Sequence, residues 1–344
     1  MKAIVKTERK PGNVEILEVE EPKIKEDDDV IVEIKSCAVC GSDLHAYEYP
    51  PSYEFMKVPV ILGHEYSGIV KEVGSKVTDF KPGDRVMGES NQYCGKCSNC
   101  KTGKTNICLN SKMTGLMIDG SLAEYIKTKE RYLHKIPEKL SFEEAAMAQP
   151  CAVSDHAVVD NTKIKPGDTV VVFGPGIVGL VAAQIVRVLG AKDVVIVGTD
   201  VDMELRIPIA QSLGFKTINV QQSDLSSELL NLTGRQKADV VIECSGANKA
   251  LQDAATIVRK GGAITLVGIY NKPVEFPFTN LVRNEVVIRT SYTCKWDNYE
   301  NVLMMLENKS VDLKPLYKIY PFKEAIKAFE DGLNKKVLKP VIRI

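Results

Sequence analysis

Short apolar runs separated by turns fill the first half of the chain. Residues 30–34 and 66–73 are apolar runs with the length and composition of β-strands. Gly74-Ser75 and the segment 81–84, which reads Lys-Pro-Gly-Asp, are typical of turns. The pattern predicts a mainly β, partly barrel-like region whose loops carry cysteines and histidines.

The pattern changes near residue 150. An apolar run at 169–173 precedes a glycine-rich segment and a stretch with helical spacing at 180–189. A second helical stretch is expected at 203–213. Three further strand-like runs are found in this half: 194–197, 238–244 and 262–268. Strands that alternate with helices predict a doubly wound α/β domain, in which helical crossovers connect the strands of a parallel sheet.

The last part of the chain mixes both patterns. Residues 299–307 and 322–332 have helical spacing, and 340–344 is a closing strand-like run. A chain of 344 residues suits two domains, and we expect the tail to return to the first of them. The predicted division is residues 1–150 with 285–344 for one domain and residues 151–284 for the other.

Composition narrows the possible partners. The 45 basic and 45 acidic residues cancel, which argues against a nucleic acid or an anionic membrane as a partner. No apolar run reaches the roughly 18 residues of a membrane helix, and the charged segment 1–10 does not resemble a secretory signal. Crowded cysteines in such a chain favour metal binding over disulfides. We therefore expect a cytoplasmic protein.

A glycine-rich segment links the first strand and helix of the second half. It fits the pattern G-x-G-x-x-G with Gly174, Pro175, Gly176, Ile177, Val178 and Gly179. Such glycines allow a tight turn, close approach of a pyrophosphate and close packing of helix on strand. The N–H groups of the helix N-terminus favour phosphates. A turn without a ligand is the alternative, but the strand and helix patterns downstream favour a dinucleotide site.

The next strand ends where such a site needs an acidic residue. Asp200 lies about 20 residues after the glycines, with Asp202 close behind, and a carboxylate there binds the ribose hydroxyls of NAD. It would also repel the 2′-phosphate of NADP, so NAD is the expected cofactor. Arg206 is either a ligand for that phosphate, which would make NADP possible, or a solvated helix charge, and the second interpretation is favoured.

Four cysteines lie within fifteen residues in the first half. Their spacing is that of a closed tetrahedral zinc site, formed by Cys94, Cys97, Cys100 and Cys108. An iron–sulfur cluster is the main competitor, and a neighbouring dinucleotide domain favours zinc. A site with four protein ligands has no open position for a substrate, which predicts a structural role.

Two shorter motifs complete a recognisable set. Residues 40–45 read Cys-Gly-Ser-Asp-Leu-His and residues 63–65 read Gly-His-Glu. Together with Lys-Pro-Gly-Asp-Arg-Val at 81–86, Gly-Ser-Leu-Ala-Glu-Tyr at 120–125, the cysteines and the glycine loop, in this order, they make the chain resemble the zinc-dependent medium-chain alcohol dehydrogenases. The resemblance covers nearly the whole length and is greatest for the sorbitol and polyol dehydrogenase branch, of which residues 309–316 are typical.

The resemblance implies a GroES-like catalytic domain, a Rossmann domain, two zinc ions per chain and a homodimer or homotetramer. It implies Cys40 and His64 as ligands of the catalytic zinc, with Glu65 as a third ligand or a close neighbour. Ser42 would take the proton from the alcohol, and His45 would pass it to solvent. Asp43 would orient a ligand. Polyol oxidation, or reduction of the matching ketose, is the implied reaction.

Two positions depart from the polyol pattern. Gln149-Pro150 replaces the usual Glu-Pro, and Cys151 is either a replacement ligand or a core residue, which is the favoured interpretation. Thr293-Cys294 replaces an Arg-Tyr pair of the substrate pocket. Another secondary alcohol, such as 2,3-butanediol, threonine or a sugar phosphate, is therefore an alternative substrate. A nucleotide-binding protein that has lost catalysis is the non-enzymatic alternative.

Overall fold

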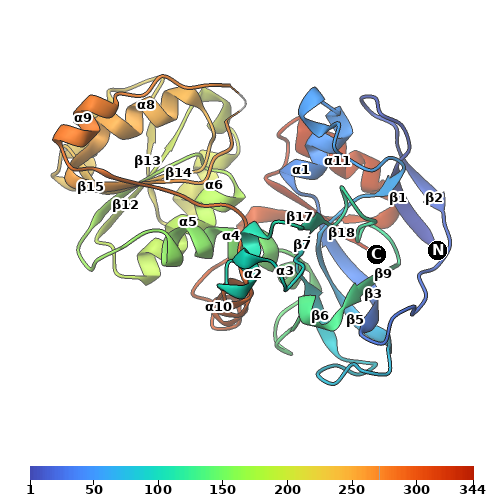
Figure 1. The fold of residues 1–344 in the computed structure, drawn as a ribbon. Helices are drawn as coiled ribbons and strands as arrows, with labels where there is room; N and C mark the ends of the chain where they lie inside the picture. Colours follow the sequence, from blue (N-terminus) through green and yellow to red (C-terminus); the bar gives the residue numbers. More distant parts are fainter. Residues whose placement is uncertain (271) are drawn as a thin grey trace. The chain divides into compact units, whose positions relative to one another are not determined.

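The chain folds into two compact units. A computed structural model describes residues 1–270 and 272–344 (Figure 1). Unit 1 consists of Met1–Gln149 and Tyr317–Ile344, and unit 2 of Pro150–Leu316. The second boundary differs from the predicted one at 284/285, because residues 285–316 stay with unit 2. They add a strand to its sheet, and the helix after that strand is tied to the same unit by a hydrogen bond from Asn298 Nδ2 to Asp155 Oδ2 of 2.9 Å.

Unit 1 is built on mainly antiparallel sheets, in which only β17 and β18 of the described strands pair in parallel. Its main sheet has the order β10-β6-β5-β3-β18-β17, with β9 also paired to β3, and the second has the order β2-β1-β4. The strands are β1 (Lys2–Lys6), β2 (Val14–Glu18), β3 (Asp29–Ala38), β4 (Val60–Ile61), β5 (Glu65–Val73), β6 (Arg85–Gly88), β7 (Asn91–Gln92), β8 (Lys112–Met113), β9 (Tyr125–Lys129), β10 (Leu133–Lys135), β17 (Tyr317–Pro321) and β18 (Lys339–Arg343).

Short helices connect and cover these strands. They are α1 (Gly41–Glu48), α2 (Ser98–Lys101), α3 (Phe142–Ala146) and α11 (Ala325–Leu333), and α4 (Ala148–Asp155) spans the boundary between the units. Alternate residues of β3 enter the core, where Val30, Val32 and Ile34 are buried. A Cβ on Gly68 of β5 would lie 2.0 Å from the Glu33 carbonyl oxygen, so only glycine permits this pairing of β3 and β5.

Unit 2 is a six-stranded parallel sheet with helical crossovers. Its order is β13-β12-β11-β14-β15-β16. The strands are β11 (Thr169–Phe173), β12 (Asp193–Gly198), β13 (Lys216–Asn219), β14 (Ala238–Glu243), β15 (Val258–Leu266) and β16 (Val287–Thr290). The helices are α5 (Ile177–Val188), α6 (Arg206–Ser212), α7 (Leu225–Thr233), α8 (Asn248–Ile257), α9 (Phe278–Arg283) and α10 (Trp296–Glu307). The doubly wound α/β fold is thus confirmed.

The strand order creates a switch point in this sheet. From β11 the chain builds outward through β12 and β13, then returns to place β14, β15 and β16 on the other side. The crevice at the carboxyl ends of β11 and β14 is where doubly wound folds bind ligands. All five residues of β11 are buried, as expected for a strand covered on both faces.

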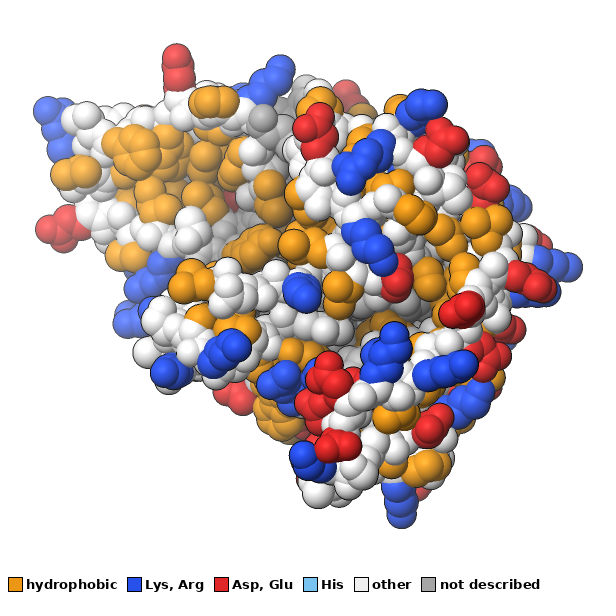
Figure 2. Space-filling model, turned by 45° about the vertical axis from the view of Figure 1, so that its right-hand side comes forward, with side chains coloured by type: hydrophobic (Ala, Val, Ile, Leu, Met, Phe, Trp, Pro, Cys, Tyr) orange, Lys and Arg blue, Asp and Glu red, His pale blue; other side chains and the backbone are white. Residues whose placement is uncertain are grey.

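The surface agrees with the neutral composition. Basic and acidic side chains are interspersed over the face seen in Figure 2. Within residues 1–270 and 272–344, none of the helices is both long and apolar enough to cross a membrane.

Candidate active site and metal centres

The loop after β3 starts the first ligand cluster. Cys40 precedes the first turn of α1, and Asp43 in that turn is fully buried. Asp43 Oδ2 accepts a hydrogen bond from the Cys40 N–H at 2.9 Å, and Asp43 Oδ1 accepts one from the Gly63 N–H at 3.1 Å. One carboxylate therefore holds together the two loops that carry Cys40 and His64. Asp43 Oδ1 also lies 3.7 Å from His64 Nδ1.

The pairing of β3 with β5 brings His64 and Glu65 close to Cys40. Glu65 begins β5 and is paired with Ala38 near the end of β3. One potential ligand atom each from Cys40, His64 and Glu65 lies within 4.8 Å of the others. His64 Nδ1 is buried and has no hydrogen-bond partner among the described residues. Such an atom normally has a partner, so this set of donors fits a metal ion.

Lys339 belongs to the same cluster and was missed by sequence reasoning. It begins β18 and is almost completely buried. Its Nζ donates a hydrogen bond of 2.7 Å to Glu65 Oε1 and lies 2.5 Å from Glu65 Oε2. The two residues are 274 positions apart. The only local signal was a lysine at the head of an apolar closing run.

The charges of this cluster match a divalent ion. Burial alone would lower the pKa of Lys339, but Glu65 and Cys40 hold it above its usual range. Burial would likewise lower the pKa of His64, but the negative charges of Asp43 and Cys40 raise it to about 10. When Cys40 is a thiolate and His64 is neutral, as metal ligation requires, the negative charges of Cys40, Asp43 and Glu65 and the positive charge of Lys339 sum to −2, which a divalent cation would neutralise.

The two proposed relay residues lie on α1. Ser42 Oγ is 3.3 Å from His64 Nε2, beside the ligand cluster. His45 follows one turn later, has a side chain that is 53% exposed, and places Nδ1 3.3 Å from Glu48 Oε2. The helix therefore leads from the buried cluster to a histidine in contact with solvent.

The residues at the departures from the polyol pattern have contacts of their own. Gln149 is buried, and its Nε2 donates a hydrogen bond of 3.1 Å to Ser90 Oγ. Cys151 is buried in the part of α4 that belongs to unit 2. Thr293 has a φ of 51°, and Cys294 beside it is buried. The amide of Gln149 thus has a structural partner within unit 1.

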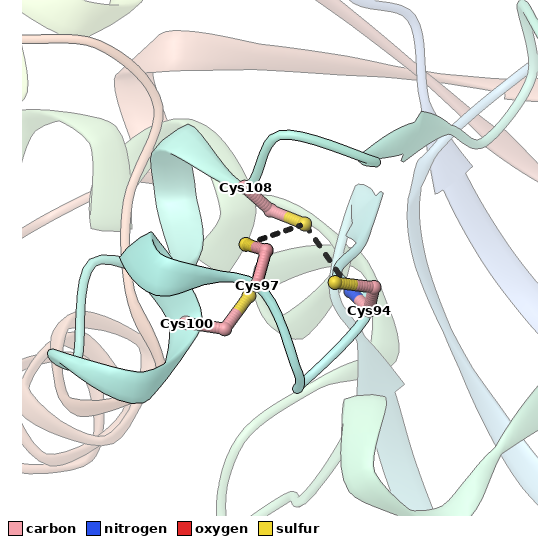
Figure 3. Close-up of side chains that lie close together, drawn as sticks. All are labelled: Cys94, Cys97, Cys100 and Cys108. Carbon is pink, nitrogen blue, oxygen red and sulfur yellow. Dashed lines mark hydrogen bonds between the residues drawn. The ribbon is translucent and has the colours of Figure 1, made fainter.

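The four-cysteine segment forms a second cluster (Figure 3). The sulfur atoms of Cys94, Cys97, Cys100 and Cys108 all lie within 4.8 Å of one another. The positive φ angles of Gly95 and Gly103, 71° and 76°, let the chain turn around them. All four are free cysteines. This is the arrangement of a tetrahedral thiolate site.

Backbone N–H groups stabilise thiolates in this cluster. Cys108 Sγ accepts hydrogen bonds from the N–H groups of Cys94 at 3.2 Å and Asn110 at 3.3 Å. Hydrogen bonds from the Lys96 N–H and the Asn110 side chain lower the pKa of Cys94 to about 6. Burial and the neighbouring Cys97 raise the pKa of Cys100 to about 12. The lowered pKa of Cys94 favours its thiolate at neutral pH, whereas Cys100 must lose a proton when it binds a metal.

The glycine loop has the geometry expected of a phosphate site. A Cβ on Gly174 would lie 2.9 Å from Ser245, and one on Gly179 would lie 2.0 Å from the Gly174 carbonyl oxygen. A Cβ on Gly176 would meet nothing within 4 Å. Gly174 and Gly179 are thus required by packing, whereas Gly176 leaves an open face at the N-terminus of α5.

The acidic residues after β12 have different tasks. Asp200 is exposed, and its Oδ1 accepts hydrogen bonds of 2.7 Å from both Asn219 and Gln222. Asp202 is buried, accepts from the Thr199 N–H and pairs with Arg206 at 3.1 Å. Asp200 is therefore the acceptor presented at the strand end, and Arg206 already has a carboxylate partner.

Fold and site together define a dehydrogenase that uses zinc and a nicotinamide cofactor, and comparisons with known proteins give the family. Residues 26–138 match the alcohol dehydrogenase GroES-like domain, and residues 178–308 match the zinc-binding dehydrogenase domain. Sorbitol dehydrogenase of Halalkalibacterium halodurans is 38% identical over 98% of both chains. The chain therefore belongs to the zinc-dependent medium-chain alcohol dehydrogenase family, which confirms the predicted family, enzyme class and cofactors.

Two further comparisons agree with this assignment. D-xylulose reductase of Saccharomyces cerevisiae is 34% identical over 94% of this chain and 92% of its own. The crystal structure of a zinc-binding dehydrogenase from Sinorhizobium meliloti, bound to NADP, has a TM-score of 0.91 at 26% identity and covers 100% of this chain and 99% of its own. The non-enzymatic alternative finds no support in these relatives.

Proposed function

We propose that this dehydrogenase oxidises a secondary hydroxyl of a polyol or sugar alcohol with NAD, and reduces the matching ketose in reverse. The observation that carries the proposal is the cluster of the partly exposed Cys40 with the buried His64 and Glu65, with Ser42 beside it. The similarity to a sorbitol dehydrogenase over nearly the full chain favours a polyol as the substrate.

Each residue of the cluster has a defined task in this proposal. Cys40, His64 and Glu65 bind the ion, and Asp43 holds their loops together. Bound zinc lowers the pKa of a hydroxyl group, and the nicotinamide accepts hydride. Ser42 takes the hydroxyl proton, and His45 passes it to solvent from the exposed side of α1.

Glu65 completes the ligand set better than Gln149 or Cys151. A carboxylate offers charge to a cation, whereas the Gln149 amide offers none and is bonded to Ser90. A second thiolate from Cys151 would make the site more negative and disfavour loss of the hydroxyl proton. Glu65→Gln should lower the content of catalytic zinc strongly and Cys151→Ser mildly. A metal titration in which Cys151→Ser loses the catalytic zinc and Glu65→Gln keeps it would contradict this assignment.

The cofactor preference rests on Asp200. The carboxylate is exposed at the end of β12 and fixed by Asn219 and Gln222. Because it accepts ribose hydroxyls and repels a 2′-phosphate, kcat/KM should be higher with NAD than with NADP. Asp200→Ala should narrow this difference. Equal or better use of NADP by the unchanged enzyme would overturn the preference.

The cluster of Cys94, Cys97, Cys100 and Cys108 is proposed to hold a structural zinc. Four thiolates leave no position for a substrate. Elemental analysis should find two zinc ions per chain. A single metal, or iron, would contradict this and favour the iron–sulfur alternative.

Other secondary alcohols remain the second candidate, on the strength of Thr293-Cys294 in place of the Arg-Tyr pair of polyol relatives. The deciding experiment is a screen of polyols, 2,3-butanediol, threonine and sugar phosphates with both cofactors, followed by the absorbance of the reduced cofactor. The polyol proposal requires the highest kcat/KM for an unphosphorylated polyol.

We further propose a homo-oligomer that forms through unit 2. The edge strand β16 has no partner on its outer side within the described sheet, and its Val287 is 43% exposed. Nearby in sequence, Phe278 and Val282 of α9 are 62% and 75% exposed. Apolar side chains gather on the surface of unit 2 at the upper left of Figure 2. A second copy would cover such an edge. Light scattering should give a dimer or tetramer, and Val282→Glu should weaken it.

The proposed location is the cytoplasm. Nine cysteines without a disulfide among the described residues suit a reducing compartment. Fractionation of the cells that make the protein tests this proposal.

A further inference from the structure

Two turns at the carboxyl edge of the parallel sheet pack directly on the glycine loop. Residues 244–247 follow β14, and residues 267–270 follow β15. A Cβ on Gly174 would lie 2.9 Å from the Ser245 Cβ, and a Cβ on Gly246 would lie 2.5 Å from the Ile269 carbonyl oxygen. The three segments therefore touch at backbone distance beside the switch point of the sheet.

One buried carboxylate joins the two turns. Glu243, the last residue of β14, is fully buried. Its Oε1 accepts hydrogen bonds from the Ser245 N–H at 2.7 Å, the Gly246 N–H at 3.1 Å and the Ser245 hydroxyl. Its Oε2 accepts one from the Tyr270 hydroxyl at 2.6 Å. The β14 turn thus binds Oε1, and its Gly246 N–H also reaches Oε2 at 3.2 Å, where the Tyr270 hydroxyl of the β15 turn binds, so Glu243 links the two turns.

The surroundings of Glu243 fit a carboxylate used as an anchor. A Cβ on Gly268 would lie 2.5 Å from Glu243 Oε2, so the second turn has closed onto the oxygen. Burial, and then the hydrogen bond to Glu243, raise the pKa of Tyr270, which keeps the phenol a donor. A buried charge without such donors would be costly, whereas donors from amides and hydroxyls make strong hydrogen bonds to it.

The position of Glu243 assigns it to one half of the cofactor. Asp200, the acceptor for the adenosine ribose, follows β12 on one side of β11. β14 and β15 lie on the other side. A dinucleotide that crosses the switch point with its pyrophosphate on the glycine loop therefore extends its nicotinamide half along the turns that Glu243 joins.

We infer that Glu243 is a positioning residue for the nicotinamide half of the cofactor, because its carboxylate holds the β14 and β15 turns against the glycine loop. Without the charge, the turns must be ordered when the cofactor binds, and that ordering weakens binding. The inference rests on the cofactor of the proposed function and is independent of the alcohol that the enzyme oxidises.

Calorimetric titration of the zinc-loaded enzyme with NADH and with AMP tests this inference. AMP probes the adenosine half alone. Glu243→Gln keeps the shape and removes the charge, and it should raise the Kd for NADH about tenfold while the Kd for AMP stays within about twofold. Tyr270→Phe removes one donor from a partly exposed residue and should raise the Kd for NADH about threefold.

Asp239→Asn is the matched control. Asp239 is a buried carboxylate near the start of the same strand, where it accepts a hydrogen bond from the Thr169 N–H at 2.9 Å and pairs with Arg259 at 2.6 Å. The substitution should lower the midpoint of thermal unfolding and leave the Kd for NADH unchanged.

Three results would overturn the inference. They are an unchanged Kd for NADH in both variants, an equal loss of NADH and AMP binding, and an equal loss of NADH binding in Asp239→Asn. If Glu243→Gln does not fold, Tyr270→Phe decides alone. A parallel titration with NADPH separates an error in cofactor preference, which changes the ratio of the two affinities in the unsubstituted enzyme, from an error in the role of Glu243.

Discussion

The two clusters of potential metal ligands in unit 1 are assembled from the chain in different ways. The four cysteines come from one segment of fifteen residues, and three of them are partly exposed. The cluster of Cys40, His64 and Glu65 is assembled at the ends of β3 and β5 and is completed by Lys339 at the start of β18. The first cluster depends on local turns, whereas the second depends on the register of a whole sheet.

Their charges differ for the same reason. Four thiolates around a divalent ion keep a net charge of −2, which nearby water and the exposed Lys96, Lys101 and Lys104 can screen. The buried cluster has no such screening, and Lys339 brings its charge to balance with the ion. The cluster of His64 and Glu65 therefore needs a positive charge from a residue distant in sequence because it is poorly exposed to water. The more exposed four-cysteine cluster needs no such residue.

The largest expected effect is on activity when the buried cluster loses its thiolate. Cys40→Ser should lower kcat/KM by about a thousandfold or more, because the Lewis acid worth several kcal/mol is lost. Cys97→Ser should instead lower the midpoint of thermal unfolding, because structural zinc contributes folding free energy. Zinc content, steady-state kinetics and thermal unfolding of both variants check this contrast.

The difference expected between Cys40→Ser and Cys97→Ser would be contradicted if both variants changed activity and stability in the same way. Equal loss of stability and activity in both would mean that the clusters share one role. Retention of two zinc ions in Cys40→Ser would remove Cys40 from the ligand set.

The second prediction concerns the balancing charge. In the metal-free enzyme, Lys339→Met leaves the Glu65 carboxylate buried and unpaired, and it should lower the free energy of unfolding by about 3–5 kcal/mol. The double variant Lys339→Met/Glu65→Gln should recover much of this loss. Urea unfolding of the single and double variants measures it. Lys76→Met, which removes an exposed partner of Asp27, is the control and should leave the unfolding midpoint nearly unchanged.

The third prediction separates proton transfer from metal binding. Ser42→Ala should lower kcat by about a hundredfold and keep both zinc ions and the cofactor affinity. His45→Gln should be milder and should be partly rescued at higher pH or by added buffer base. Near-full activity of Ser42→Ala at neutral pH would exclude the relay.

The fourth prediction concerns the pH dependence of metal uptake. In the metal-free cluster the pKa of His64 is raised to about 10, above its ordinary value, so the imidazole is protonated at neutral pH. That proton must leave before the nitrogen binds a metal, so affinity should rise with pH up to about 10, by about tenfold per unit for one proton. Competition titrations with a chelator between pH 7 and 9 measure the slope. A flat profile would mean that His64 is neutral before the metal arrives.

Sequence reasoning worked where the chemistry is local. The glycine loop needs a strand, a turn and a helix in immediate succession, and all three are visible between residues 169 and 189. The domain boundary was wrong by about thirty residues, because a short strand such as β16 has no local mark that assigns it to one of two sheets. Its neighbour β15 decides that assignment.

The sequence by itself determined the alternation of strands and helices typical of a parallel sheet, the spacing of the four cysteines and the motifs that identify the family, because each is a pattern of residues close together in the chain. Only the tertiary structure decided that Lys339 neutralises Glu65 and that Glu243 joins two turns at the cofactor crevice. Glu65 and Glu243 are both buried carboxylates whose partners come from other strands or turns. A buried charge is stable only with such partners, and the pairing of strands sets which residues they are.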